Sequence, residues 1–327
     1  MGATGRNSVT AIGEQSDKDT AATTLTKLLA TGNNLEDNIN TVQSEALTGN
    51  RFAADGYKTS EGPGGDIPAE VSRQTLPMIL KHAIGPEQAA PEDLGAGSGP
   101  YKHTFKPGQS LDNWLTFLKF FSDDPYWELY KGSKISQLQF SLSEQSIITY
   151  TASILSLESE NGVGSPSVSP DENTGAKLFS WETTATWDAG GTDKDLSGIV
   201  DEFSFTHNNN IDGEDYGLSQ KRRGLDAQGG EHNCDMTIQF SAADYQDMKT
   251  DLKENNIIPV KLDIGLASDD TTPFLTIDYP KLKLTQVNAN ISGPDKVTVS
   301  VQANAFWDTV AEYNVAMMLT DDQDTEY

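Results

Sequence analysis

The stretch KISQLQFSLSEQSIITYTASILSL, residues 134–157, alternates apolar and polar residues, turns, and alternates again. A second stretch, KLTQVNANISGPDKVTVSVQANAF, residues 283–306, aligns with it without a gap, 149 positions further along the chain. Because side chains alternate across a β-strand, each stretch predicts a β-hairpin with one buried and one more polar face. Gly-Pro-Asp at 293–295 is favourable turn chemistry for the second hairpin. The chain therefore contains the same hairpin twice.

A second similarity lies upstream of each hairpin. Residues 65–85, GDIPAEVSRQTLPMILKHAIG, parallel residues 234–255, CDMTIQFSAADYQDMKTDLKEN, at a spacing of 169. In each, an extended run leads to a serine and then to apolar residues at helical spacing, which predicts a strand followed by an amphipathic helix. Gly85 predicts the end of the first helix, and Ser241 with Asp244 resembles a capping box at the start of the second.

These features occur in the same order in both halves of the chain, which indicates a duplication. Each half has an extended pair, a long polar loop (48–66 and 207–233), a strand, a helix and further strands. We therefore expect a mainly β fold with a small α content, built from two tandem β-sandwich or barrel modules, each with a flanking helix. The Gly-, Ser- and Pro-rich stretch between them is typical of a linker. The expected divisions are an N-terminal arm at 1–23, module 1 at 24–160, a linker at 161–175, module 2 at 176–308 and a C-terminal arm at 309–327.

The composition restricts the class of partner. The 327 residues include 49 acidic and 23 basic residues, for a net charge of −26, and so acidic a surface repels nucleic acid and anionic membranes. The single Cys234 excludes an internal disulfide framework and fits a reducing compartment of synthesis. The start of the chain lacks the apolar core of a signal peptide, and no run of 18 apolar residues predicts a membrane span.

The sequence shows no recognisable catalytic or metal motif, so we expect neither an enzyme nor a bound cofactor or metal. The four histidines, His82, His103, His207 and His232, lack catalytic or metal-like spacing, and no second pair completes a zinc site with His232 and Cys234. The segment NIDGED at 210–215 comes closest to a calcium loop but lacks the full ligand spacing. A solvated acidic surface is the favoured interpretation of the acidic clusters.

Lys221, Arg222 and Arg223 form the one basic cluster in this acidic chain. Because they lie in the second long loop, we favour a contact with carboxylates of a neighbouring subunit. A solvated loop and a small nucleic-acid patch are the alternatives, and the cluster lacks the interleaved aromatic residues typical of the latter.

The order of these features resembles the tail tube proteins of long-tailed, siphovirus-like double-stranded DNA phages, of the type with duplicated modules. Residues 31–85 are similar to the family's opening, with an Arg-bearing loop, a Gly-rich return, a strand and a Leu-rich helix ending in Gly. Residues 103–154 resemble its next segment, with an aromatic-Lys-Gly approach to the long hairpin, and residues 203–245 resemble its second half. The long N-terminal arm, the acidity and a short second helix depart from the pattern.

The resemblance implies a tail-tube-type β-sandwich or barrel whose modules join, six to a ring, around a lumen. Two modules per chain imply homotrimers that form a pseudo-hexameric ring, with a homohexamer as the alternative. The implied location is the virion tail, after assembly in the host cytoplasm, with no membrane partner. Implied partners are other copies of the chain, a tape measure protein and DNA in the lumen without sequence-specific binding, and tail terminator and distal tail proteins at the ends.

A conduit for DNA ejection needs a lining that does not grip phosphates, so neutral polar or acidic residues suit it. The polar positions of the two hairpins are our candidates for that lining: Gln137, Gln139, Thr149, Thr151, Thr298, Ser300, Gln302 and Asn304. The long loops are expected to reach the neighbouring ring through Arg51, Tyr57, Arg222 and Arg223.

The alternative from another class is a two-domain β-sandwich that binds carbohydrate in adhesion. Its exposed aromatic residues would be Trp114, Trp127, Trp181 and Trp187, although core packing explains tryptophans within strands equally well.

Overall fold

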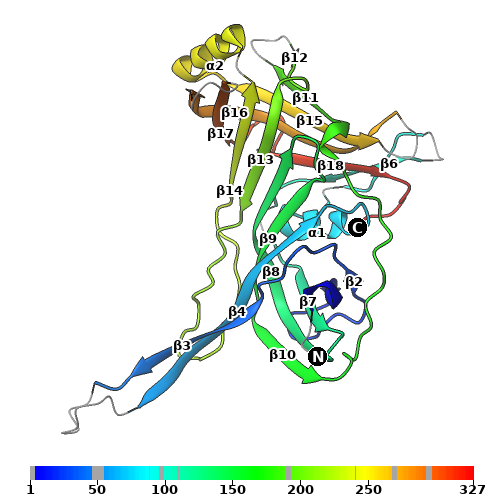
Figure 1. The fold of residues 1–327 in the computed structure, drawn as a ribbon, viewed down its shortest axis with the longest axis vertical. Helices are drawn as coiled ribbons and strands as arrows, with labels where there is room; N and C mark the ends of the chain where they lie inside the picture. Colours follow the sequence, from blue (N-terminus) through cyan, green and yellow to red (C-terminus); the bar gives the residue numbers. More distant parts are fainter. Residues whose placement is uncertain are drawn as a thin grey trace.

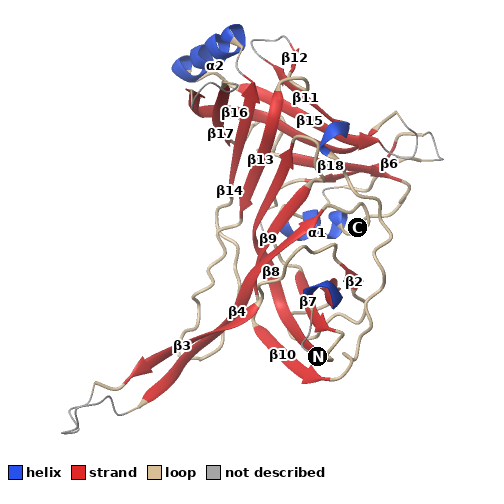
Figure 2. Cartoon of the chain, viewed as in Figure 1, coloured by secondary structure: helices blue, strands red, loops and turns tan. Residues whose placement is uncertain are grey.

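The computed structural model describes residues 4–45, 55–87, 89–95, 99–108, 111–188, 193–239, 241–266, 271–291 and 297–327. In this part of the chain the fold is mainly β, with the helices α1 (Leu76–Ala83) and α2 (Ala242–Glu254) and the short 3-10 turns Gly5–Asn7 and Ser180–Glu182 (Figures 1 and 2). The expected fold class, mainly β with a small α content, is confirmed. Neither helix is long and apolar enough to cross a membrane.

The strands fall into two groups along the chain, which we call the first half and the second half. The strands of the first half are β1 (Ser8–Gln15), β2 (Thr26–Lys27), β3 (Glu36–Gln43), β4 (Gly56–Glu70), β5 (Glu92–Asp93), β6 (Tyr101–Phe105), β7 (Trp114–Phe121), β8 (Tyr126–Ser143), β9 (Thr149–Leu155) and β10 (Glu158–Val163). Those of the second half are β11 (Thr183–Asp188), β12 (Asp193–Asp195), β13 (Val200–Asn208), β14 (Glu231–Gln239), β15 (Ile258–Leu266), β16 (Pro273–Asn290), β17 (Thr298–Ala305) and β18 (Ala316–Asp321).

One antiparallel sheet, which we call the shared sheet, contains strands from both halves. Its order is β3-β4-β9-β8-β13-β14-β17-β16. The two predicted hairpins are β8–β9 and β16–β17. The halves meet where β13 pairs with the edge of β8 that β9 leaves open (Figure 1).

The long strands β8 and β16 each continue from the shared sheet into a flanking sheet, and the flanking sheet of β16 also includes β6 and β5 of the first half. The first flanking sheet has the order β2-β1-β7-β8-β10, and the second has the order β12-β11-β15-β16-β18-β6-β5. Strands β1 and β18 therefore belong to the sheets, although the sequence predicted arms outside both modules at 1–23 and 309–327. The physical reason is burial: Ala11 and Ile12 are fully buried on β1, as are Ala316 and Met317 on β18.

The two halves repeat the same pairing register. In β8–β9 the register shifts between Ile135 and Gln137, and in β16–β17 it shifts between Leu284 and Gln286, which are the aligned positions of the two hairpins. Upstream, Gly64 on β4 pairs with Leu155, and Asn233 on β14, 169 positions later, pairs with Asn304. The sequence alignment of the halves is thus also an alignment of their hydrogen-bonded strands.

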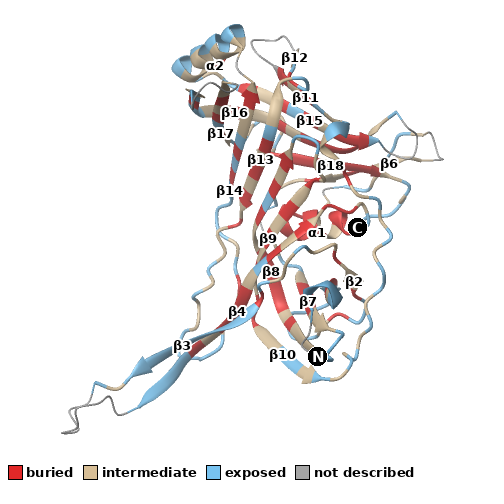
Figure 3. Ribbon diagram, in the orientation of Figure 1, coloured by how far each residue is buried: buried red, intermediate tan, exposed pale blue. Residues whose placement is uncertain are grey.

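The two helices differ in burial (Figure 3). Helix α1 buries a full apolar stripe, Leu76, Ile79, Leu80 and Ala83, whereas α2 fully buries only Met248. Gly85 follows α1 with φ 152°, and a Cβ there would lie 2.3 Å from a backbone oxygen, so the predicted glycine stop is confirmed. At 13 residues α2 is longer than the 8-residue α1, so the second helix is not the shorter one.

The main apolar core extends through both halves, and a smaller cluster of Ala11, Ala22, Leu25 and Leu118 lies in the first half. On the two sides of the junction between the halves, the rings of Phe140 (β8) and Phe205 (β13) stack with centroids 4.9 Å apart. The expected linker at 161–175 lies along the first half, since the Lys27 amide donates to the Asp171 carbonyl at 2.9 Å and the Ser72 hydroxyl bonds Asn173 at 2.7 Å. The halves are therefore joined by a common core as well as by the chain.

Candidate functional site

The candidate site is the polar face of the shared sheet together with the open edges of that sheet. On β8, Ile135, Leu138, Phe140 and Leu142 are buried in the core. The residues between the last three therefore point to the opposite face, and the same alternation holds on the neighbouring strands. One row of paired residues crosses six strands on that face: Thr149, Ser141, Ser204, Asp235, Gln302 and Gln286.

The structure brings all eight predicted lining residues onto this one face. Gln139 pairs with Thr151 within the first hairpin and with Thr206 across the junction. Thr298, Ser300, Gln302 and Asn304 follow one another along β17 at every second position, opposite the polar residues of β14. Whether the face lines a lumen stays a prediction, because a single chain does not test it.

The centre of this face carries no basic residue. The described strand segments 137–143, 149–153, 202–208, 233–239 and 298–304 contain no lysine or arginine, and they contribute the acidic Glu202 and Asp235. Lys283 pairs with Asn304 and marks the margin of this surface on β16. A surface of this kind offers no counter-charge to phosphates, so it does not hold nucleic acid electrostatically.

The shared sheet ends in two open edges. Among the described residues, the C-terminal part of β16 has a strand partner only in β17, whereas the aligned part of β8 has both β9 and β13. As a consequence Leu142 is 5% exposed, while Ile291, at the aligned position, is 79% exposed. At the other end of the sheet β3 pairs with β4 alone, and every residue of β3 is exposed.

Lysine side chains contact a carbonyl group at each open edge. The ammonium group of Lys249 on α2 donates to the Val287 carbonyl on β16. At the other end of the sheet, Lys119 donates to the Leu35 carbonyl at 3.0 Å, beside the Tyr130 hydroxyl at 3.1 Å. Lysines at sheet edges are a common protection against uncontrolled strand pairing.

A buried chain of hydrogen bonds spans the junction between the halves. The Asn209 amide nitrogen donates to the backbone carbonyls of Ala83 at 2.8 Å and Ile135 at 3.0 Å, so the amide oxygen is free to accept. It accepts from Nε2 of His207 at 3.0 Å. Loop residue Asn209 of the second half thereby ties the end of α1 to β8.

The proton positions in this chain follow from its geometry. Since His207 donates through Nε2, its Nδ1 accepts from Nδ1 of His232 at 3.1 Å, and Nε2 of His232 accepts from the Tyr279 hydroxyl at 3.0 Å. This arrangement requires both imidazoles to be neutral. Burial lowers the pKa of His207 to about 4 and places the pKa of His232 well below its ordinary value. In the sequence, the only signal for this network is the polar run His-Asn-Asn-Asn at 207–210.

The predicted inter-ring residues lie in different surroundings. Arg51 falls outside the described residues, and Tyr57 is 56% exposed on the arm formed by β3 and β4. The half-buried guanidinium of Arg222 donates to the backbone carbonyls of Gly213, Pro63 and Ser156 at 2.7, 2.7 and 3.0 Å. Arg223 pairs with Asp215 in its own loop. Within one chain, Arg222 thus fastens the second long loop to the first half, and an inter-ring role for these residues stays a prediction.

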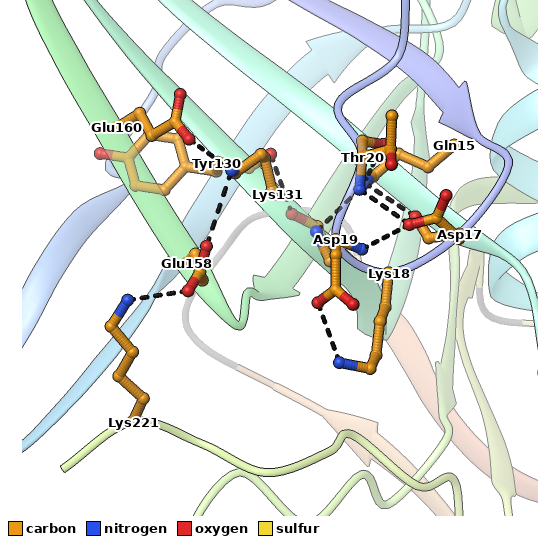
Figure 4. A network of polar contacts seen from close by, with 12 residues as sticks. Gln15, Asp17, Lys18, Asp19, Thr20, Tyr130, Lys131, Glu158, Glu160 and Lys221 are labelled. Carbon is orange, nitrogen blue, oxygen red and sulfur yellow. Dashed lines mark hydrogen bonds and ion pairs between the residues drawn. The ribbon is translucent and has the colours of Figure 1, made fainter.

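An exposed ion-pair network reinforces the same attachment (Figure 4). Lys221 of the second long loop lies 2.7 Å from Glu158 on β10, and Lys131 on β8 bridges Glu158 and Glu160. Such exposed pairs each contribute little to stability. The pair with Glu158 shows that Lys221 of the basic cluster contacts a carboxylate of its own chain.

The structure gives little support to the sugar-binding and metal-binding alternatives of the sequence analysis. Trp187 is buried and Lys134 lies over the ring of Trp114, which leaves Trp181, 61% exposed, as the most accessible of the four tryptophans proposed for sugar binding. In the part of the chain that the structure describes, no group of His, Cys, Asp or Glu side chains is arranged to hold a metal ion. Asp212 of the NIDGED segment accepts the Glu214 amide at 2.9 Å, as in an ordinary polar turn.

A family model described as phage tail tube protein matches residues 5–305, so the chain belongs to the phage tail tube protein family. No curated protein matches the chain. The protein is therefore a structural component of the phage tail, from a family whose members assemble into a tube and are not enzymes.

Proposed function

We propose that this protein forms stacked rings that make the tail tube of a siphovirus-like phage, and that the tube conducts double-stranded DNA during ejection. The observation that carries the proposal is the polar face of the shared sheet, whose central segments lack any lysine or arginine. If this face lines the bore, DNA meets neutral and acidic groups and slides without releasing counterions.

Two equivalent halves per chain favour a ring of three chains over a ring of six. The pairing of β13 with β8 already joins two modules within one chain. A duplicated module therefore halves the number of subunits that a ring has to collect. Heterologous contacts that close by rotation give rings, and stacking of the rings gives an open-ended tube.

The arm formed by β3 and β4 projects away from the rest of the chain (Figure 1). Its exposed Tyr57 is our candidate for a contact with the next ring, together with Arg51 and, once rings stack, Arg222 and Arg223. We propose the tape measure protein as an occupant of the lumen, and the tail terminator and distal tail proteins as partners at the tube ends. Assembly is proposed to take place in the host cytoplasm.

Electron microscopy of the purified protein in negative stain tests the assembly. We expect threefold rings and tubes of stacked rings. A protein that stays monomeric at every concentration, with no tubes in the presence of phage tail extract, would contradict the proposal.

The role of the polar face is tested by charge. We expect tubes of the Gln139→Lys, Thr206→Lys, Gln302→Lys variant to protect short DNA duplexes from nuclease at low salt, and wild-type tubes to protect none. Because phosphate contacts weaken as salt rises, protection should decline between about 50 and 200 mM salt. A control with lysines at Glu160, Asn161 and Val163 on β10 binds DNA outside the tube without protecting it. If tubes of the first variant are intact but protect no DNA, the placement of the polar face in the bore would be contradicted.

A further inference from the structure

The strand pairing at the junction within the chain can be mapped onto a junction between two chains, because the two halves have equivalent positions. Within the chain, Thr206 on β13 lies opposite Gln139 on β8. Gln139 aligns with Asn288, because the hairpins are 149 positions apart. The position equivalent to Thr206 follows from the strand pairings of the aligned residues Leu155 and Asn304.

Leu155 and Asn304 are aligned residues of the two hairpins. Leu155 pairs with Gly64, which pairs with Glu36. Asn304 pairs with Asn233, which pairs with Thr206. Glu36 on β3 is therefore the equivalent of Thr206.

We propose that β3 pairs antiparallel with the open edge of β16 of a second copy, with Glu36 opposite Asn288. The same register places Asp37 opposite Val287. This inference rests on the proposed function, since it defines the contact that closes the ring. The occupant of each open edge is thus another copy of the chain, offering the complementary edge.

Exposure of apolar residues supports this pairing. The aligned residues Leu142 and Ile291 differ from 5% to 79% in exposure because β13 covers only the first of them. At the other edge, Ile39 is 52% exposed. Its equivalent is Asn209, which contacts the carbonyls of Ala83 and Ile135 in the junction within the chain.

The surroundings of Ile39 in the second junction follow from the same equivalence. Ala83 aligns with Leu252 on α2, and Ile135 aligns with Leu284 on β16; both leucines are half-buried. Ile39 of the second copy would therefore cover two leucines that the lone chain leaves partly open to water.

A charge pair completes the match. Asp37 is the equivalent of His207, which is linked to the end of α1 through Asn209 in the junction within the chain. In the second junction Asp37 lies opposite Val287, whose carbonyl accepts the ammonium group of Lys249. Docking therefore brings the Asp37 carboxylate to Lys249, and the lysine that protects the open edge becomes the partner of the incoming strand.

Engineered cysteines test the register. The backbone N–H of Asn209 donates to the Ser136 carbonyl at 2.8 Å, so Asn209 and Ser136 form a hydrogen-bonded pair. Hydrogen-bonded and non-hydrogen-bonded pairs alternate along an antiparallel ladder. Thr206 and Gln139, three positions further along, therefore form a non-hydrogen-bonded pair. Such pairs bring Cβ atoms within disulfide reach. We expect oxidised Glu36→Cys/Asn288→Cys protein to give covalent trimers on a non-reducing gel. The matched control, Thr206→Cys/Gln139→Cys, should close a disulfide within the chain.

Mixing the two single-cysteine variants shows whether β3 of one chain pairs with β16 of another. Glu36→Cys alone and Asn288→Cys alone should give no specific crosslink, and their mixture should give covalent dimers only. The pair Glu36→Cys with Gln286→Cys, two residues out of register, should crosslink at least tenfold less. The native Cys234 is buried and stays in place. Tubes that form normally while the control pair closes and the Glu36–Asn288 pair does not would overturn the register but leave the proposed function intact.

A charge reversal provides an independent test that does not depend on oxidation. We expect Asp37→Lys and Lys249→Asp each to reduce the assembled fraction at least tenfold in sedimentation, and the double variant to recover most of it. Both positions are outside the apolar core, so the unassembled chain should keep its denaturation midpoint. Assembly unchanged by either reversal, or no recovery in the double variant, would overturn the pairing of Asp37 with Lys249. Absence of any assembly in the wild-type protein would instead contradict the proposed function.

Discussion

The first half of the molecule covers its helix and one edge of its hairpin, whereas the second half leaves the equivalent helix and edge open. Helix α1 buries four apolar residues, but α2 buries only Met248. Strand β8 has a partner on both sides, but the aligned part of β16 has a partner on one. The difference does not come from the hairpin pattern, which is the same in both halves; it comes from what lies next to each hairpin in space.

This comparison shows how two halves with the same hairpin pattern can differ in the strands that pair beside the hairpin. The first half receives β13 and the loop that follows it, including Asn209 and Arg222. Among the described residues, no strand plays that part for the hairpin of the second half. An open edge of this type is a hazard in a lone chain and a binding surface in an assembly.

The largest expected effect contrasts the two helices. In the unassembled chain, Leu80→Ala on α1 should lower the free energy of unfolding by about 2–5 kcal/mol, because it leaves a cavity at a fully buried site. Leu252→Ala on α2 should cost less than about 1.5 kcal/mol, because Leu252 is only half-buried. Urea denaturation of both variants measures the difference. Equal losses would show that α2 is as well packed as α1.

A second prediction concerns pH. His207 has a folded pKa of about 4, below the ordinary 6.5 of an unfolded histidine, so the unfolded chain binds more protons between these values. Stability should therefore fall as pH is lowered from 6.5 to 4.5, by about 2–3 kcal/mol for this residue. The equivalent position in the first half is Asp37, which adds no histidine to this window. Urea midpoints across the window measure the slope.

Substitution identifies the source of that slope. His207→Gln should reduce it, whatever it does to stability at pH 7, and the buried His232, whose pKa is also lowered, accounts for the slope that remains. His82 in the first half is the control: burial lowers its pKa too, but the Glu14 carboxylate, 2.9 Å away, opposes the shift. His82→Gln should therefore change the slope less. An unchanged slope in His207→Gln would contradict the neutral hydrogen-bond chain.

The smallest effects contrast neighbouring cations of the second long loop. Arg222→Gln should cost about 1.5–3 kcal/mol, because a half-buried guanidinium donates to three backbone carbonyls, each of which would lose this donor. Lys221→Gln should cost less than about 1 kcal/mol, because its pair with Glu158 is exposed. Thermal or urea denaturation at 0.15 M salt compares the two. A larger loss for Lys221 would mean that the exposed network, and not Arg222, fastens the loop.

Much of the fold could be predicted because its signals are local. Alternation in 134–157 and 283–306 placed the polar and buried faces of both hairpins, and all eight predicted lining residues lie on one face. The strands β1 and β18 were missed at the ends of the chain, because short apolar runs among polar residues carry little periodicity. Within this chain Arg222 donates to carbonyls that are far away in the sequence, which no local pattern predicts, and its contact between subunits stays a prediction.

By itself, the sequence determined that the chain holds two equivalent hairpins, which residues share a face, and that the central face is free of positive charge. These properties depend on side-chain identity at a period of two, which is readable residue by residue. Only the tertiary structure decided that β13 of one half pairs with β8 of the other, that two histidines share a neutral hydrogen-bond chain, and that β16 keeps an open edge. The physical reason is that strand pairing uses backbone N–H and C=O groups, which are the same in nearly every residue, so the sequence pattern does not specify which edge meets which.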